Sequence, residues 1–210
     1  MASPVPRTDF PTLARQARGG NRLVYLDSGA TSLKPRAVLD AVEEMSVAKN
    51  GAVKRGSHLL AEEASAAFED ARDKVARFVG ADPGELVWTS GTTQSINLLA
   101  YAMSNVSAGR GPSVGASALQ GRLSAGPGDS VVVTRAEHHA NLVPWQELCR
   151  RTGAELRWLD CDSDGRIDLE TLSVIDGSTK LVAFAHVSNV TGAVAPVEAV
   201  VAAAREAGAL

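Results

Sequence analysis

Three short runs of this sequence combine residue types that can bind or transform a small charged molecule. The run Gly91, Thr92, Thr93 puts a glycine and two hydroxyls at the expected start of a helix. Free N–H groups and the helix dipole favour a phosphate dianion at such a position. His138 follows an apolar run, so its imidazole can stack on a planar ring or exchange a proton near neutral pH. Asn189 follows another apolar run and offers an amide that both donates and accepts hydrogen bonds.

Each of these runs also has a purely structural interpretation. Serine and threonine are common helix N-caps, a histidine can cap a helix, and asparagine is a frequent turn residue. Ligands of an open parallel sheet bind outside the carboxyl ends of its strands. Because all three runs follow predicted strands, their coincidence favours the functional interpretation. We therefore predict that Thr92, Thr93 and His138 share one ligand pocket.

A metal site is not predicted. The sequence has no HExxH motif, and the remaining histidines, His58 and His186, lie on separate segments without ligand spacing. Cys149 and Cys161 are the only cysteines and do not form a CxxC pair. Both are predicted to be reduced thiols that serve packing.

Strands and helices are predicted to alternate along most of the chain. Apolar runs predict strands in the segments 23–31, 85–91, 130–138, 154–162 and 179–192. Helical spacing of apolar residues predicts helices in the segments 32–51, 61–81, 92–104, 140–153, 169–175 and 196–208. Continuously apolar strands are typical of sheets that are buried on both sides. The sequence therefore predicts an α/β fold with a mostly parallel sheet and helices on both faces.

The predicted organisation is an N-terminal arm at residues 1–22 followed by one α/β region, part of a domain, at residues 23–210. Within this domain the segment 104–129 is rich in glycine and serine and shows no periodicity. Such a composition predicts a long surface loop.

The composition argues against several classes of function. Of the 210 residues, 45% are hydrophobic and 21% are charged, which is typical of a globular protein. A net charge of −3 and an aromatic content of 4% argue against a nucleic-acid-binding surface. No apolar run reaches the roughly 18 residues of a membrane helix, and the N-terminus lacks the apolar core of a signal peptide. We therefore expect a cytoplasmic protein with neither a membrane nor a nucleic-acid partner.

Six segments carry a family resemblance that covers nearly the whole chain outside residues 104–129. The chain resembles the class V aminotransferase family and, within it, the group II cysteine desulfurases that supply sulfur for iron–sulfur cluster assembly. The pattern EHHAN–VPW followed by HVSNV–G is quite specific to that group. The matching segments are YLDSGATSLKP (25–35), AVKRGSHLLAEEA (52–64), WTSGTTQSINLLAY (88–101), AEHHANLVPWQEL (136–148), DGRIDLETL (164–172) and HVSNVTGAVAPV (186–197).

The resemblance implies that residues 23–210 are the N-terminal part of the large domain of the fold-type I architecture. It also implies the cofactor pyridoxal 5′-phosphate and a homodimer. The implied reaction converts L-cysteine to L-alanine and leaves the sulfur as a persulfide, which passes to a sulfur-acceptor or scaffold protein. One alternative is another enzyme of the same family, such as a transaminase or a selenocysteine lyase. Another is a non-catalytic chain that retains a dimer or partner surface.

The resemblance also assigns roles to the three runs described above. Gly91, Thr92 and Thr93 would hold the cofactor phosphate. His138 would be the catalytic residue that stacks on the pyridine ring and helps proton transfers. Asn189 would approach both the ring oxygen and the substrate carboxylate.

Two further segments would contribute to the substrate pocket. Gly29 and Ala30 would line this pocket, and Arg55 and His58 would lie on a loop at its entrance. Lys54 stands where the family usually has a histidine, and an ammonium group cannot exchange a proton as an imidazole does.

The resemblance puts the lysine that forms the Schiff base with the cofactor beyond Leu210. The family also has an aspartate, a small domain, a substrate-binding arginine and a sulfur-accepting cysteine in that later part. The five lysines of this chain lie in other contexts: Lys34, Lys49, Lys54, Lys74 and Lys180. We therefore expect a truncated form with an incomplete fold, which does not catalyse the reaction by itself.

Overall fold

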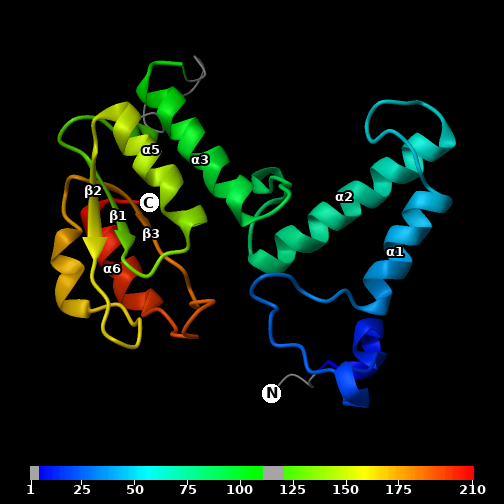
Figure 1. The fold of residues 1–210 in the computed structure, drawn as a ribbon. Helices are drawn as coiled ribbons and strands as arrows, with labels where there is room; N and C mark the ends of the chain where they lie inside the picture. The colour runs from blue at the N-terminus through cyan, green and yellow to red at the C-terminus, as the bar shows by residue number, and fades with distance from the viewer. Residues whose placement is uncertain (1–4, 111–120) are drawn as a thin grey trace. The chain divides into compact units, whose positions relative to one another are not determined.

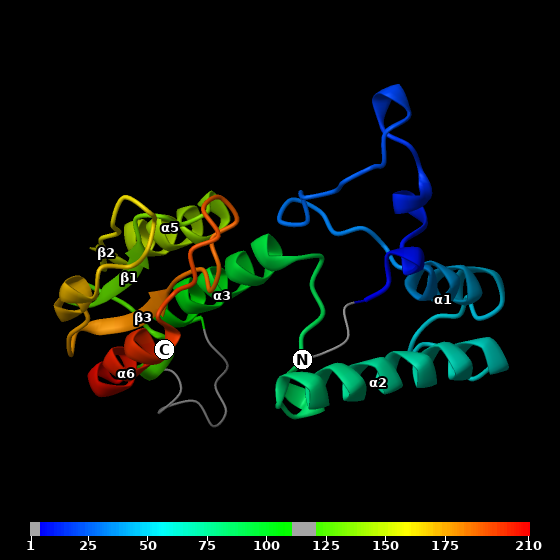
Figure 2. The same cartoon turned by 90° about the horizontal axis from the view of Figure 1, so that it is seen from below.

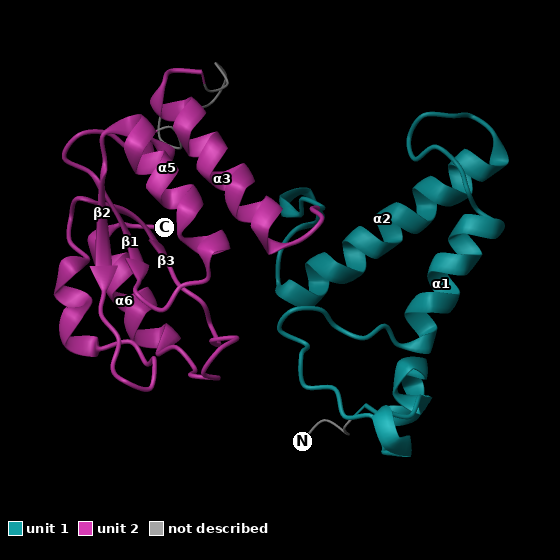
Figure 3. Ribbon diagram, viewed as in Figure 1, with its two compact units in different colours: residues 1–88 teal, residues 89–210 magenta. Residues whose placement is uncertain are grey.

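The computed structural model describes residues 5–110 and 121–210. The chain divides into two compact units, residues 1–88 and residues 89–210, which are coloured separately in Figure 3 and are described here one at a time. The predicted arm at residues 1–22 falls within unit 1, where its described part forms three short 3-10 helices: η1 (Arg7–Asp9), η2 (Pro11–Ala14) and η3 (Arg18–Gly20).

Unit 1 contains two long helices at the predicted places. Helix α1 (Arg36–Val47) begins directly after Pro35, and helix α2 (Leu59–Val79) ends at Gly80, whose φ of 72° is a conformation that glycine adopts readily. Their amphipathic spacing was sufficient to predict both helices. A short 3-10 helix, η4 (Pro83–Glu85), closes the unit.

Two predicted strands of unit 1 are wrong. The segment 23–31 forms a turn, in which the Ala30 N–H donates to the Asp27 carbonyl at 3.2 Å, and residues 86–88 after η4 have no regular structure. A strand requires a neighbour for its backbone hydrogen bonds, and in the described residues no strand pairs with either segment. Their apolar side chains are correspondingly open to solvent, with Leu26 92% and Val87 66% exposed.

Unit 2 is built on three parallel strands in the spatial order β2-β1-β3. They are β1 (Ser130–Thr134), β2 (Glu155–Leu159) and β3 (Thr179–Ala183), each within a predicted segment (Figure 1). Leu210 adds a parallel pairing beside β3, since the Val182 N–H donates to its carbonyl at 2.8 Å and its own N–H donates to the Lys180 carbonyl at 3.0 Å.

Helices cover both faces of this sheet, as predicted. On one face, Val131 and Val133 pack in a core cluster with residues of α3 (Thr92–Ser107) and α5 (Val143–Thr152). On the other face, Val132 packs with Val200 of α6 (Val197–Ala207), and the 3-10 helix η6 (Leu169–Val174) adds to the same cluster. Figure 2 shows α5 and α6 on opposite sides of the strands. The alternation along β1 follows from the pleat of a strand.

The glycine- and serine-rich segment 104–129 is partly helical. Helix α3 continues to Ser107 and is therefore longer than predicted, while residues 111–120 lie outside the described part of the chain. Residues 124–129 lead into β1 through a turn in which the Asp129 N–H donates to the Gly126 carbonyl at 3.0 Å. Among the described helices, none is both long and apolar enough to cross a membrane.

Replacing Leu159 with alanine should cost a large part of the stability of unit 2. Leu159 is completely buried at the end of β2 and packs with Val132, Ile175 and Val200. A Leu→Ala change at such a site costs about 2–5 kcal/mol, against a total stability of about 5–15 kcal/mol for an ordinary domain. Urea unfolding followed by circular dichroism measures this loss. The control Leu169→Ala removes a side chain that is 51% exposed and should change stability little; equal losses would contradict the assigned core.

Candidate functional site

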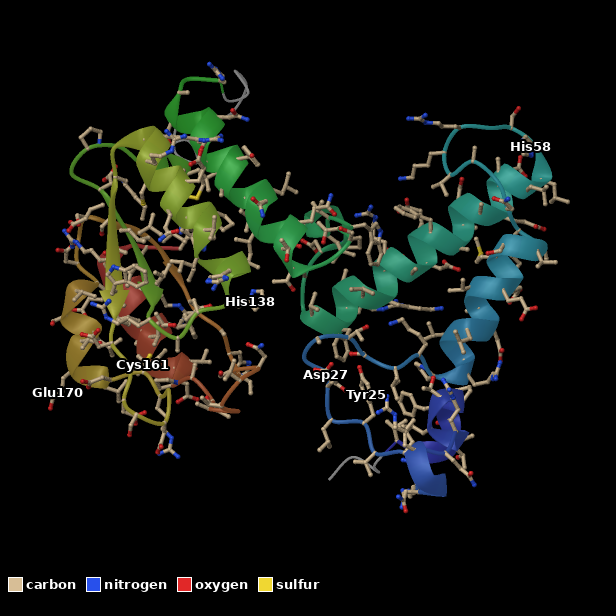
Figure 4. The ribbon with its side chains drawn as sticks, in the orientation of Figure 1. Tyr25, Asp27, His58, His138, Cys161 and Glu170 are labelled. Carbon is tan, nitrogen blue, oxygen red and sulfur yellow. The ribbon has the colours of Figure 1, made fainter. Side chains whose placement is uncertain are left out.

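The candidate site lies in unit 2, where the carboxyl ends of the three strands meet. A shallow pocket opens there, and residues that follow all three strands line it, among them Glu137 after β1, Cys161 after β2 and Ser188 after β3. Figure 4 labels His138 and Cys161 at this end of the sheet. Parallel strands bring their carboxyl ends to one edge, so residues distant in sequence share this region.

The N-terminus of α3 is shaped for an anion. Its N-cap is Gly91, whose φ of 157° and ψ of 176° fall in a region that is essentially restricted to glycine. No side chain caps the helix, so the N–H groups of Thr92 and Thr93 have no capping partner among the described residues. Both threonines are exposed, and a Cβ at Gly91 would meet no atom within 4 Å. These donors and this open space fit a phosphate group.

The imidazole of His138 is exposed and held by one ring nitrogen. His138 is the N-cap of the 3-10 helix η5 (His139–Asn141), and its Nδ1 accepts a hydrogen bond from the Ala140 N–H at 3.0 Å. With Nδ1 acting as an acceptor, the neutral ring carries its proton on Nε2. The ring therefore has a face and one N–H that are available to a planar ligand.

Asn189 lies on a tight hairpin that follows β3. The Ser188 N–H donates to the Ala193 carbonyl at 2.9 Å, and the Gly192 N–H donates to the Ser188 carbonyl at 3.0 Å. The Ser188 hydroxyl oxygen accepts from the N–H groups of Val190 and Thr191, at 3.2 Å each. These bonds fix the backbone on both sides of Asn189 and leave its amide exposed.

Contacts within unit 2 connect the elements that carry these groups. Helix α3 contacts η5, the short helix that His138 caps, and Ile96 and Leu142 both pack on the same core cluster. Glu137 bonds to the backbone just before the Asn189 hairpin, at Ala185. The predicted cofactor residues of unit 2 thus stand on connected elements at one end of the sheet, but they do not line the pocket described above. Their shared ligand pocket and their individual roles stay predictions.

The predicted substrate residues belong to unit 1. Gly29 and Ala30 are exposed in the turn that follows Asp27, and Arg55 is exposed in a turn closed by its N–H to the Ala52 carbonyl at 3.2 Å. Their part in a pocket stays a prediction. His58 serves locally as the N-cap of α2, since its Nδ1 accepts from the Ala61 N–H at 3.4 Å.

Lys54 forms an ion pair and a backbone hydrogen bond within unit 1. Its Nζ lies 2.6 Å from Oε1 of Glu69, and its N–H donates to the Ser65 hydroxyl oxygen at 2.8 Å. The hydrogen bond from Lys54 holds the pKa of the Glu69 carboxyl below its usual value. The φ of Lys54 is 57°, which is uncommon for a residue with a side chain. Both bonds tie the turn that carries Arg55 to helix α2.

In unit 2, no described lysine lies at the carboxyl end of the sheet. Lys180 is the sole lysine of residues 89–210, and it lies near the amino end of β3 with its Nζ 3.5 Å from Asp129 Oδ1. Within residues 5–110 and 121–210, no three His, Cys, Asp or Glu side chains form a group that could hold a metal ion.

The two cysteines should react slowly with alkylating reagents. Burial raises the pKa of the Cys149 thiol to about 11, and burial is also the main cause that raises the pKa of Cys161. Alkylation requires the thiolate, so both should lag behind glutathione at pH 8, with Cys161 modified before the buried Cys149. Iodoacetamide labelling followed by peptide mass mapping checks this order. Rapid labelling of native Cys149 would contradict its burial.

Comparison with known proteins identifies similar chains. The family model described as aminotransferase class V matches residues 24–210. A probable cysteine desulfurase 2 from Mycobacterium leprae is 52% identical over 97% of this chain and 46% of its own length. The apo structure of a cysteine desulfurase from Thermococcus onnurineus NA1 has a TM-score of 0.80 and 33% identity, covering 97% of this chain and 45% of that chain. The S-sulfonic acid form of the cysteine desulfurase CsdA from Escherichia coli gives 0.75 and 34%, covering 97% and 46%. The chain thus spans about half the length of the relatives that it matches.

Proposed function

This chain belongs to the class V aminotransferase family, and we propose that it serves the pyridoxal-phosphate-dependent desulfuration of L-cysteine. The observation that carries the proposal is the set of an uncapped helix N-terminus, an exposed imidazole and an exposed amide on connected elements at the carboxyl end of the sheet. The 52% identity to a probable cysteine desulfurase supports the choice of substrate.

The residues of unit 2 would bind the cofactor by its two ends. The N–H groups and hydroxyls of Thr92 and Thr93 bind the phosphate, and Gly91 leaves space for it. His138 stacks on the pyridine ring, offers its Nε2–H to the ligand and helps proton transfers. Asn189 orients the ring oxygen and the substrate carboxylate. When bound, the cofactor supplies an electron sink for negative charge at the substrate α-carbon.

The overall reaction moves one sulfur atom. The C–S bond of L-cysteine breaks and an S–S bond forms on an acceptor cysteine thiolate, so that the products are L-alanine and a persulfide. Neither Cys149 nor Cys161 suits the acceptor role, because burial raises the pKa of both thiols. Gly29, Ala30 and Arg55 of unit 1 are proposed as substrate-binding residues on the family resemblance alone.

The finer parts of the proposal concern partners. We assign the chain to the group II desulfurases, acting as a homodimer that passes sulfur to an acceptor protein of iron–sulfur cluster assembly. The sequence pattern of residues 136–145 and 186–192 supports this assignment.

Binding of pyridoxine 5′-phosphate to the 210-residue chain tests the cofactor site. This ligand has no aldehyde, so it cannot form imines with surface lysines. We expect it to bind at least tenfold more tightly than pyridoxine in isothermal titration calorimetry, because only the phosphate ester can use the N-terminus of α3. Equal affinities would contradict the phosphate site.

Turnover tests the substrate assignment. An intact-length version of the protein, which carries residues 1–210 and the later part that the family resemblance implies, should form L-alanine and sulfide in equal amounts from L-cysteine, a thiol reductant and pyridoxal 5′-phosphate. Alanine formation from L-selenocysteine but not from L-cysteine would overturn the desulfurase assignment in favour of a selenocysteine lyase.

A further inference from the structure

Glu137 occupies a position that the function described so far does not use. It follows β1 and directly precedes His138. Its side chain is half-buried and lines the pocket at the carboxyl end of the sheet. A carboxylate in such a place needs hydrogen-bond donors for both of its oxygens, because an unpaired charge away from water is costly.

Three donors from three different elements meet this carboxylate. Oε1 accepts from the Thr134 hydroxyl at 2.9 Å, at the end of β1, and from the Ala185 N–H at 2.7 Å, just after β3. Oε2 accepts from Nδ2 of Asn141 at 2.8 Å, in η5. The Asn141 Oδ1 in turn accepts from Nε1 of Trp145 in α5 at 3.0 Å, and the Trp145 side chain is 2% exposed.

These bonds connect the two loops that carry the candidate cofactor groups. Ala185 lies four residues before Asn189, and the hairpin between them is braced by the Ala195 N–H, which donates to the His186 carbonyl at 2.8 Å. On the other side, Glu137 precedes His138, and Asn141 closes the η5 turn by donating its N–H to the His138 carbonyl at 2.8 Å. The Glu137 carboxylate is therefore shared by the His138 turn and the Asn189 hairpin.

We propose that Glu137 is a positioning residue that sets the spacing between the imidazole of His138 and the amide of Asn189, the two groups proposed to contact the pyridoxal ring. This inference rests on the proposed function for the identity of the ligand, but the coupling of the two loops does not depend on any ligand. Hydrogen bonds to a charged acceptor are shorter and stronger than neutral ones, which suits a carboxylate to this role.

Hydrogen exchange followed by NMR tests the coupling without a ligand. In Glu137→Ala the Ala185 N–H loses its acceptor, so its exchange should accelerate at least tenfold, and the amide resonances of residues 188–193 should shift. Glu137→Gln should give a smaller change in the same residues, because its amide oxygen can still accept from Ala185 while its NH2 meets the Nδ2 donor of Asn141. This second variant keeps the test decisive if the alanine variant does not fold.

Glu155→Gln is the matched control. Glu155 lies at the amino end of β2 and pairs with Arg157 at 2.8 Å, at the opposite end of the sheet. This change should leave the exchange of Ala185 and the hairpin resonances unaffected. Folded Glu137 variants with the wild-type exchange rate at Ala185, or with shifts confined to residues next to 137, would overturn the proposal.

Ligand affinity then separates this proposal from the proposed function. If Glu137 sets the spacing of His138 and Asn189, Glu137→Ala should weaken pyridoxine 5′-phosphate binding about tenfold, while its effect on inorganic phosphate, which needs only the N-terminus of α3, should be small. If the Ala185 N–H exchanges at the wild-type rate in folded Glu137 variants, while the wild-type chain binds pyridoxine 5′-phosphate, the positioning role alone is refuted. Absence of ligand binding in the wild-type chain, with the exchange effect present, would refute the cofactor assignment and leave the coupling of the loops supported.

Discussion

Replacing Gly91 with alanine should lower the affinity for pyridoxine 5′-phosphate about tenfold or more. At φ 157° and ψ 176°, Gly91 holds a conformation that costs a residue with a side chain about 1–3 kcal/mol. An alanine would relieve this strain by rotating the backbone, which turns the Thr92 N–H away from the anion. Because about 1.4 kcal/mol corresponds to a factor of ten in affinity, the expected loss is measurable by calorimetry.

Gly177→Ala provides the control for this experiment. Gly177 precedes β3, a Cβ there would also meet no atom within 4 Å, and its φ is not among the positive values of the described glycines. The substitution should therefore leave both stability and ligand affinity close to wild type. If Gly91→Ala and Gly177→Ala bind the ligand equally well, the N-terminus of α3 is not the phosphate site.

The strands of unit 2 were predictable because the residues within each strand are enough to indicate it. Ser130–Thr134 contains three consecutive valines, and a strand that is buried on both sides reads as such a run. The amphipathic helices and the glycines that end them are equally local, as at Gly80 and Gly208. Since parallel strands place their carboxyl ends together, the residues after β1 and β3 could be assigned to one region from the order of elements alone.

The errors come from interactions between distant residues. The apolar runs at 23–31 and 85–91 have the composition of strands, but pairing is not a property of the run itself, and in the described residues neither segment has a partner strand. Glu137 was missed for the same reason. Its bond to Ala185 spans 48 residues, and an acidic residue after a strand carries no sequence signal of such a contact.

The family motif marks residues without showing how they are held. The motif EHHAN names Glu137, His138 and Asn141 together, but the resemblance assigned a role only to the first histidine. In the structure Asn141 donates its side-chain amide to Glu137 and its backbone N–H to the His138 carbonyl, so both residues hold the turn that carries this histidine. Lys54 is a second example, since the resemblance marks it only as a departure from the family's histidine, and the structure shows its side chain paired with Glu69.

Replacing His138 with alanine should reduce alanine formation from L-cysteine about 10²–10⁴-fold, as expected for the loss of a general acid–base group. The same change in His139, the neighbouring exposed histidine, should have little effect. The measurement is the initial rate of alanine production by variants of an intact-length version of the protein, with pyridoxal 5′-phosphate present. Equal and small effects of the two substitutions would exclude His138 as the catalytic histidine.

His138 also has a structural role that this comparison must separate. Its Nδ1 accepts from the Ala140 N–H, and losing an N-cap costs about 1 kcal/mol of stability. His138→Asn keeps a side-chain acceptor for that cap but has neither an aromatic face nor a titratable group. We therefore expect the asparagine variant to retain the wild-type unfolding midpoint and yet lose activity as fully as the alanine variant. Recovery of activity in His138→Asn would show instead that His138 acts only through the fold of the η5 turn.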